Sequence, residues 1–137
     1  MTTIESDITE LPAGIETVKD FLSDVRGFED LMPDQVVDWK ADQNSCKFTI
    51  KGTADLGFRK QENVGNNEIS YFSTPPSPFG FTLKALLFPI NKQSTNIIFL
   101  LDAELNAFLQ MVAGRPLKNL LNHMAARLRE MPAMKTR

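Results

Sequence analysis

Hydrophobic and polar residues alternate along much of the chain between residues 3 and 105, and this period of two is typical of strands that bury one face. The clearest example is the segment 45–51, in which Cys46, Phe48 and Ile50 share one face and polar residues share the other. The same alternation predicts strands over residues 3–10, 36–41, 45–51, 54–64, 68–74, 79–90 and 95–105.

Glycine, proline and asparagine mark the ends of these segments. The sequence Gly-Asn-Asn at 65–67 predicts a hairpin turn, because glycine and asparagine tolerate positive φ angles. The prolines within 75–78 end the strand before them, since proline cannot donate to a strand ladder. Gly57 predicts a bulge or bend inside 54–64, and a bulge there would turn Arg59 inward in place of Lys60 and Glu62.

Two parts of the chain have the period of an amphipathic helix. Residues 14–22 and 25–31 predict a short, broken helical pair after the first strand. Near the C-terminus, spacings of three and four place Leu117, Leu120, Leu121, Met124, Leu128 and Met131 on one apolar stripe. We expect Pro116 at the first position of this long helix, where its missing N–H does no harm, and a separate helical turn or two over 107–113.

A long helix that follows a run of antiparallel strands has one favourable position, across the concave face of the curved sheet. The sequence therefore predicts a single α+β domain over residues 1–137. In it, an antiparallel sheet of six or seven strands wraps around the C-terminal helix. The sheet and the helix would enclose an apolar space between them.

The placement of four stretches carries a resemblance to a known superfamily. They are GIETVKDFLSDVRGFEDLMPDQV after the first strand, VVDWK, the pair CKFTI and ADLGFRK, and FLLDAELNAFLQMVAGRPLKNLLNHMAARL. Over residues 2–131 the layout resembles the helix-grip fold of the SRPBCC superfamily, which includes START-like lipid-transfer domains, birch-pollen allergens, polyketide cyclases and co-chaperone-like domains. The loop ADQNSC is not the glycine-rich loop of the allergen branch, and the short chain looks more like a small bacterial member.

The resemblance implies that a small hydrophobic ligand, such as a lipid, a fatty acid or a polyketide-like molecule, binds between the sheet and the helix. We expect its contacts to come from Phe48, Ile50, Phe58, Tyr71, Phe81, Phe99, Leu117, Leu121, Met124 and Leu128. A buried tyrosine hydroxyl needs a partner, and the ligand could supply one to Tyr71. The helical pair 14–31 and the loop 75–78 would flank the entrance.

Two other functions stay open at this point. A cyclase or dehydratase would need an acid and a base in the cavity, and Lys60, Glu62, Tyr71 and Arg59 are the available side chains. An interaction module, dimeric or co-chaperone-like, would instead use an apolar patch on the convex face of the sheet. That patch, and a homodimer formed through it, would consist of Leu86, Phe88, Ile98 and Leu100.

Composition and charge narrow the chemistry further. One cysteine, Cys46, and one histidine, His123, lie far apart in sequence, so we expect no metal, no cofactor and no covalent catalysis. Residues 114–137 carry 6 basic side chains and 1 acidic one, which suits a solvated helix C-terminus, and we expect no nucleic-acid partner. The start MTTIESDITE lacks a signal pattern and no apolar run approaches the ~20 residues of a membrane span, which indicates a soluble, cytoplasmic protein.

Overall fold

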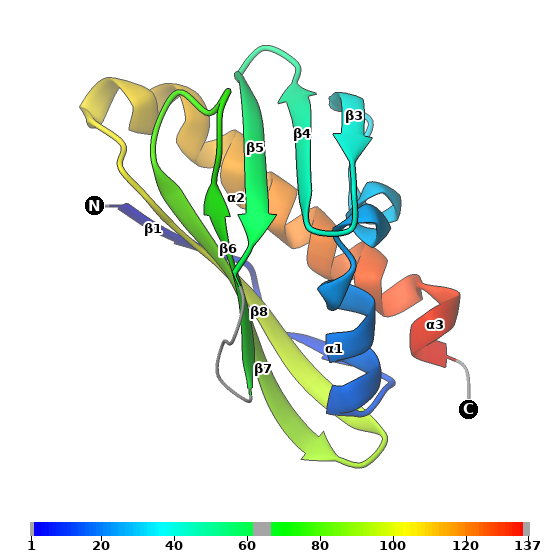
Figure 1. Cartoon of the computed structure of the whole chain (residues 1–137). Helices are drawn as coiled ribbons and strands as arrows, with labels where there is room; N and C mark the ends of the chain where they lie inside the picture. The colour runs from blue at the N-terminus through cyan, green and yellow to red at the C-terminus, as the bar shows by residue number, and fades with distance from the viewer. Residues whose placement is uncertain (1, 62–66, 136–137) are drawn as a thin grey trace.

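A computed structural model describes residues 2–61 and 67–135 of the chain (Figure 1). Its strands are β1 (Thr2–Glu5), β2 (Thr9–Leu11), β3 (Val36–Ala41), β4 (Ser45–Ile50), β5 (Ala54–Lys60), β6 (Glu68–Ser73), β7 (Phe81–Asn91) and β8 (Ser94–Ala103). Its helices are α1 (Ile15–Ser23), the 3-10 helix η1 (Val25–Leu31), α2 (Ala107–Glu130) and α3 (Pro132–Lys135). The predicted turn at 65–67 and the inward position of Glu62 fall mostly or wholly outside the described residues.

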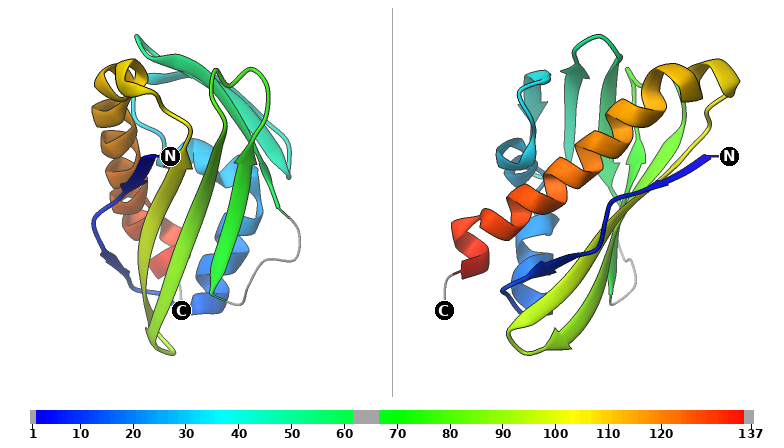
Figure 2. Two further views of the ribbon diagram at one scale, coloured as in Figure 1. Left: turned by 90° about the vertical axis from the view of Figure 1, so that its left-hand side faces the viewer. Right: turned by 180° about the vertical axis from the view of Figure 1, so that it is seen from behind.

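The strands form one antiparallel sheet in the order β1-β8-β7-β6-β5-β4-β3, and β2 also pairs with β8. The sheet curves around α2, which crosses its concave face diagonally, while α1 covers the other end of that face (Figure 2). The predicted α+β helix-grip architecture is therefore confirmed. The described sheet has eight strands instead of six or seven, because the first predicted strand is divided in two.

The division of the first strand occurs at Ser6. The backbone N–H of Ser6 donates to the carbonyl of Phe99 (2.8 Å), and its hydroxyl accepts from the N–H of Phe99 (2.9 Å). The side chain thus takes the place of a ladder partner and interrupts the regular strand between β1 and β2. The predicted alternation fails just beyond this point, since Ile4 is buried but Ile8 is 65% exposed.

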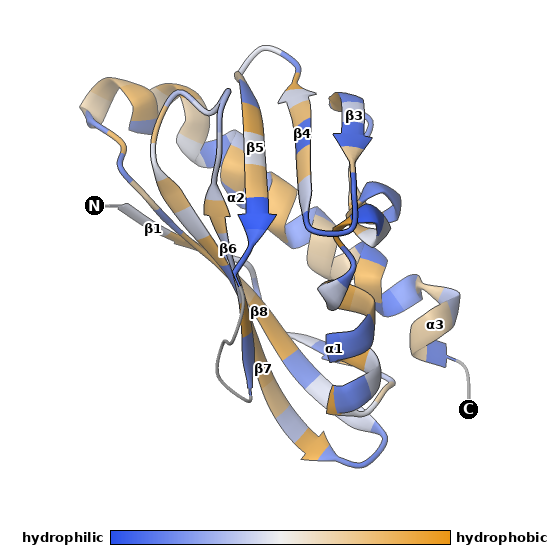
Figure 3. Ribbon diagram, viewed as in Figure 1, coloured by the Kyte–Doolittle hydropathy of each residue, from blue (hydrophilic) through white to orange (hydrophobic). Residues whose placement is uncertain are grey.

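The alternation along the longer strands is confirmed. Inward residues of β8 such as Ile97 and Phe99 are fully buried, whereas their neighbours Ile98 and Leu100 lie on the convex face and are only half-buried. β7 follows the same rule, and Leu86 lies directly opposite Ile98 on that outer face. Figure 3 shows hydrophobic and hydrophilic residues succeeding one another along these strands.

The C-terminal helix differs from the prediction at Pro116. Helix α2 runs without interruption from Ala107 to Glu130 and contains Pro116 in its interior. Proline normally breaks a helix because it lacks the N–H that would donate one turn back. Here Ala113 and Leu117, on either side of it, are both buried, so tertiary packing of the stripe holds the two parts of the helix in line.

One bulge and one close approach of the backbone shape the sheet near its β3 edge. Asp38 has a positive φ of 55° at a bulge in β3, which turns Val37 outward and lets Trp39 stack on Phe48 (ring centroids 5.5 Å apart). Gly57, in contrast, lies in regular pairing with Lys47, so the predicted bulge there is wrong. A Cβ atom at Gly57 would lie 2.9 Å from Thr74 Oγ1, which shows that the glycine is needed for close approach of the loop after β6.

Candidate functional site

The main internal feature is an apolar hollow between the sheet and α2. It has a volume of about 30 Å³. Its walls come from the inward faces of β4, β5, β7 and β8, from the end of η1 and from the stripe of α2. The lining residues, all of them apolar, are Met32, Phe48, Leu56, Phe58, Phe79, Phe81, Leu83, Leu101, Leu117, Leu120, Leu121 and Met124.

The predicted ligand contacts divide into two groups. The structure places six of them around the hollow, namely Phe48, Phe58, Phe81, Leu117, Leu121 and Met124. The other four are buried in the same core without lining it, namely Ile50, Tyr71, Phe99 and Leu128. Ile50 and Leu128 lie near the ends of β4 and α2, away from the middle of the helix where the hollow lies.

Six further residues line the hollow that the predicted set does not contain. Leu56, Leu83 and Leu101 follow from the same strand alternation, and Leu120 belongs to the helical stripe. These four could have been found by applying the same rule to every inward leucine instead of favouring aromatic residues. Met32 and Phe79 lie in connecting segments, where no periodic pattern shows the direction of a side chain.

The Tyr71 hydroxyl already has a partner within the chain. It donates to the carbonyl oxygen of Leu22 at 2.8 Å, and the ring is fully buried. Leu22 belongs to the last turn of α1, where the backbone carbonyl groups accept no hydrogen bond from the helix itself. Burial raises the pKa of Tyr71 well above its ordinary value of 10.0, so the hydroxyl stays protonated as a donor. The expected role of a ligand as its partner is thus filled by the helix end.

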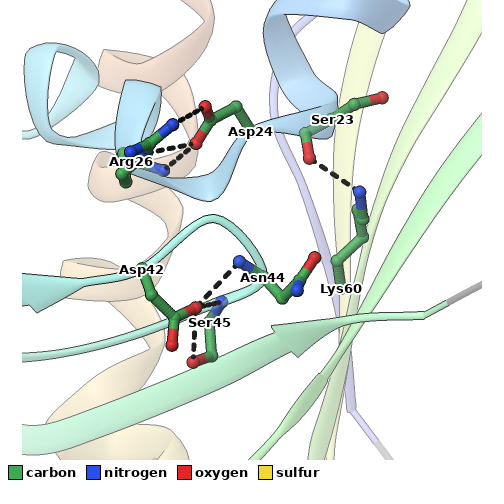
Figure 4. Close-up of polar contacts among 7 residues, drawn as sticks. All are labelled: Ser23, Asp24, Arg26, Asp42, Asn44, Ser45 and Lys60. Carbon is green, nitrogen blue, oxygen red and sulfur yellow. Dashed lines mark hydrogen bonds and ion pairs between the residues drawn. The ribbon is translucent and has the colours of Figure 1, made fainter.

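Lys60 also acts at the end of α1. Its Nζ donates to the carbonyl oxygen of Ser23 at 2.8 Å (Figure 4), which places a cation at the negative end of the helix dipole. Arg59 is exposed on the outer face, opposite Phe72 of β6. Among the described acid–base candidates, none lines the hollow, so no acid–base pair converges there.

The size of the hollow limits what it can hold as it stands. On this measure of volume, a cavity needs about 10–15 Å³ to admit one water molecule. The present hollow therefore resembles the space of one or two waters in a wholly apolar setting. A hydrophobic ligand of ten or more heavy atoms needs its walls to separate.

The walls of the hollow are least tightly packed at the N-terminal end of α2. Phe108, Met111 and Val112 are 69%, 83% and 41% exposed, and this end of the helix extends to the limit of the molecule (Figure 2). Its described anchors are the partly buried side chain of Leu109 and a hydrogen bond from Gln110 Nε2 to Thr2 Oγ1 (2.7 Å). The loop after β6 reaches the same end, where Glu104 N–H donates to the carbonyl of Gly80 (2.9 Å).

Comparison with solved structures identifies the fold. A START superfamily protein from Mycobacterium smegmatis superposes with a TM-score of 0.67 at 15% identity, covering 93% of this chain and 97% of that one. The Zhui aromatase/cyclase from Streptomyces sp. R1128 gives 0.63 at 16% identity, with 94% of each chain covered. Norcoclaurine synthase from Thalictrum flavum, in complex with dopamine and hydroxybenzaldehyde, gives 0.70 at 12% identity, covering 94% of this chain and 84% of that one.

These similarities show that the chain has the helix-grip fold of START-like proteins, as its sequence predicted. At such low identities they extend to the fold alone. No protein-family model matches the sequence, and no curated protein matches it.

In the described segments, no helix is long and apolar enough to cross a membrane. Within those segments, His, Cys, Asp and Glu side chains do not gather in threes around a metal position.

Proposed function

We propose that this protein binds a small hydrophobic ligand in the space between the sheet and α2. The observation that carries the proposal is the composition of the hollow, since each of its lining residues is apolar. A lining of this kind favours lipid, fatty-acid or polyketide-like molecules, whose apolar parts gain free energy when they leave water. The aromatase/cyclase and the synthase with similar structures indicate only that this fold can carry sites of different chemistry.

The ligand enters, in this proposal, between the first turns of α2 and the loop after β6, so the helical pair 14–31, which the sequence also predicts beside the entrance, takes no part in it. Pro116 cannot donate a hydrogen bond to the carbonyl of Val112, so the helix is weakest between these residues. Residues before Pro116 can therefore move away from the loop 74–80 while Leu117 and the rest of the stripe stay packed. The polar end of a fatty acid would remain at this opening, in contact with water.

A polyene fatty acid, cis-parinaric acid, provides a direct test in solution. Trp39 stacks on Phe48, which lines the hollow, so energy transfer from the single tryptophan should report a bound polyene. The matched variants are Leu101→Phe, which fills the hollow, and Leu100→Phe, which adds the same atoms on the outer face.

We expect saturable 1:1 binding that Leu101→Phe weakens by about tenfold, equivalent to 1.4 kcal/mol, and that Leu100→Phe leaves unchanged. Native mass spectrometry of the purified protein would identify a ligand that copurifies. Equal affinity in both variants would mean that the probe binds elsewhere, and the proposed site would be wrong.

A homodimer through the convex face is a second proposal, favoured by the exposed position of its apolar residues. Leu86 and Ile98 are cross-strand partners, Leu100 is half-buried, and Phe88 is 47% exposed at the end of this row. Light scattering after size exclusion should give twice the chain mass for the wild type and the chain mass for Leu100→Asp. A wild type that stays monomeric at high concentration would contradict the dimer.

We also propose a cytoplasmic location, with which the free, buried thiol of Cys46 is compatible.

A further inference from the structure

A second hollow lies on the opposite, outer face of the sheet, and its chemistry is unlike that of the first. It has a volume of about 450 Å³ and is open to solvent. Its floor is β4, one wall is the end of β3, and the other is the start of the loop after β6. This wall stands close to the floor because Gly57 has no side chain, and a Cβ atom there would lie 3.1 Å from the carbonyl oxygen of Pro75.

Three cations gather in this outer groove. Lys40 of β3 lies directly opposite Lys47 of β4 in the sheet, so both side chains leave the same face. Lys47 pairs with Gly57, and Arg59 lies two residues further along β5 on that face, a diagonal neighbour of Lys47. All three line the groove. Figure 3 shows hydrophilic segments on β3, β4 and β5.

This arrangement is unfavourable for folding, because like charges directly opposite each other in a sheet repel. Across residues 2–61 and 67–135, none of the three cations forms an ion pair or a side-chain hydrogen bond. A single cation on an outer face is ordinary, but an opposed lysine pair with an adjacent arginine leaves an excess of positive charge, which favours binding of an external anion. The open groove provides room for one.

The acidic residues nearby accept hydrogen bonds from neighbouring groups of the turn after β3 and of β4. Asp42, which also lines the groove, accepts hydrogen bonds from the N–H groups of Asn44 and Ser45 and from the Ser45 hydroxyl (Figure 4). Asp55, on the same face of β5, accepts from the Thr49 hydroxyl at 2.7 Å. Asp38 lies at the bulge of β3 and does not line the groove. The pKa of Asp42 is lowered mainly by the hydrogen bonds from the Asn44 and Ser45 backbone and also by the charge of Arg59, so the groove keeps three cations against one carboxylate.

We propose that this outer groove binds a phosphate-type oxyanion, either free phosphate or the phosphate group of a small molecule. Arg59 offers a planar fork for two oxygens, and the two lysines offer compact charges on flexible stems. Thr74 also lines the groove and carries a neutral hydroxyl donor. The volume exceeds that of one phosphate ion, so a phosphate ester fits it as well as the free ion.

The site is independent of the apolar hollow. Along β4, Phe48 points into the hollow and Lys47 points into the groove, so the two sites use opposite faces of the same strand. Failure of fatty-acid binding would leave this proposal intact, and the reverse also holds.

The test is an NMR titration of the full chain with inorganic phosphate and, separately, with phenyl phosphate, at constant ionic strength set by sodium chloride. We expect saturable shifts of the backbone amides of Ser45, Lys47, Arg59 and Thr74. The double variant Lys47→Gln/Arg59→Gln should weaken binding by about tenfold or more, because it removes two charge-assisted contacts. Lys84→Gln, on the outer face of β7, is the matched control and should bind as the wild type does.

The two ligands distinguish the source of the oxyanion. Tighter binding of phenyl phosphate identifies a phosphorylated small molecule, and equal or tighter binding of inorganic phosphate identifies the free ion. Shifts that rise linearly without saturation, or an equal loss in Lys84→Gln, would reduce the effect to general charge screening and overturn the proposal. The melting temperature gives a second readout, since phosphate should raise it in the wild type and in Lys84→Gln but not in the double variant.

Discussion

Substitution Tyr71→Phe tests the junction between α1 and the sheet. The ring of Tyr71 makes edge contacts with Phe28 and Phe58 at centroid distances of 5.3 and 5.4 Å, and a phenylalanine ring can keep both. Only the hydroxyl is lost, and with it the 2.8 Å hydrogen bond to the carbonyl of Leu22. The substitution therefore isolates one buried polar contact between residues 49 positions apart.

The expected loss follows from the group that remains. Leu22 is fully buried, so its carbonyl cannot exchange the lost donor for water. A buried acceptor left without a partner costs about 1–3 kcal/mol, and the phenylalanine ring is slightly easier to bury than tyrosine, which offsets part of this. We expect the free energy of unfolding to fall by about 1–2 kcal/mol and the melting temperature to fall by roughly 3–8 °C.

Urea unfolding followed by Trp39 fluorescence and by far-ultraviolet circular dichroism measures this difference. Phe72→Leu is a suitable control, because Phe72 is the next residue of β6 but is 42% exposed on the outer face, and its replacement should change stability little. A neutral Tyr71→Phe would show that the helix end rearranges and that this hydrogen bond does not fasten α1. If Tyr71→Phe kept its stability but lost parinarate binding, the Tyr71 hydroxyl would instead be a ligand contact.

Three further results are expected. Lys60→Met should lower the free energy of unfolding in urea by about 0.5–1.5 kcal/mol, because the carbonyl of Ser23 loses a charged donor; no change would contradict its role at the helix end. Gly57→Ala should destabilise by about 1–3 kcal/mol through its contacts at 2.9 and 3.1 Å, whereas Gly114→Ala, in open space on α2, should stabilise by about 0.5–1 kcal/mol; equal effects would refute the close-approach argument. Burial raises the pKa of Cys46 from 9.0 to about 12, so the thiol of the unfolded chain ionises between pH 9 and 12 while that of the folded chain stays protonated, and the stabilisation present below pH 9 is lost over this range. Cys46→Ala should therefore reduce the fall of the unfolding free energy in this range by about 1.4 kcal/mol per pH unit. Parallel curves of unfolding free energy against pH for the wild type and the variant would contradict the shift.

The sheet and the gripped helix could be predicted because their signals are periodic. In β4, the inward residues Cys46, Phe48 and Ile50 are buried as the alternation requires. The stripe of α2 is likewise buried from Leu117 to Leu128. Each such residue repeats the same information, so an error at one position does not change the assignment of the element.

Features set by single contacts could not be predicted in this way. Ile8 is exposed because Ser6 bonds to the backbone of Phe99, and Lys60 turns to the end of α1 because an unsatisfied carbonyl lies within its reach. Pro116 lies within the helix because packing on both sides of it outweighs the lost hydrogen bond. The volume of the hollow depends on how the side chains interlock, which a pattern of residue types does not contain.

The small hollow also sets a lower limit on the ligand. Opening the space beneath α2 exposes Leu109 and breaks the hydrogen bond between Gln110 and Thr2, at a cost of about 2–4 kcal/mol. Association adds a cost of about 4 kcal/mol or more for lost freedom of motion. Each buried CH₂ group returns about 0.8 kcal/mol, so an alkyl chain needs on the order of ten carbons before binding is favourable at all. Short acids should therefore fail to open the proposed site, and the ligand that we propose is one long enough to replace the contacts of the helix end with its own.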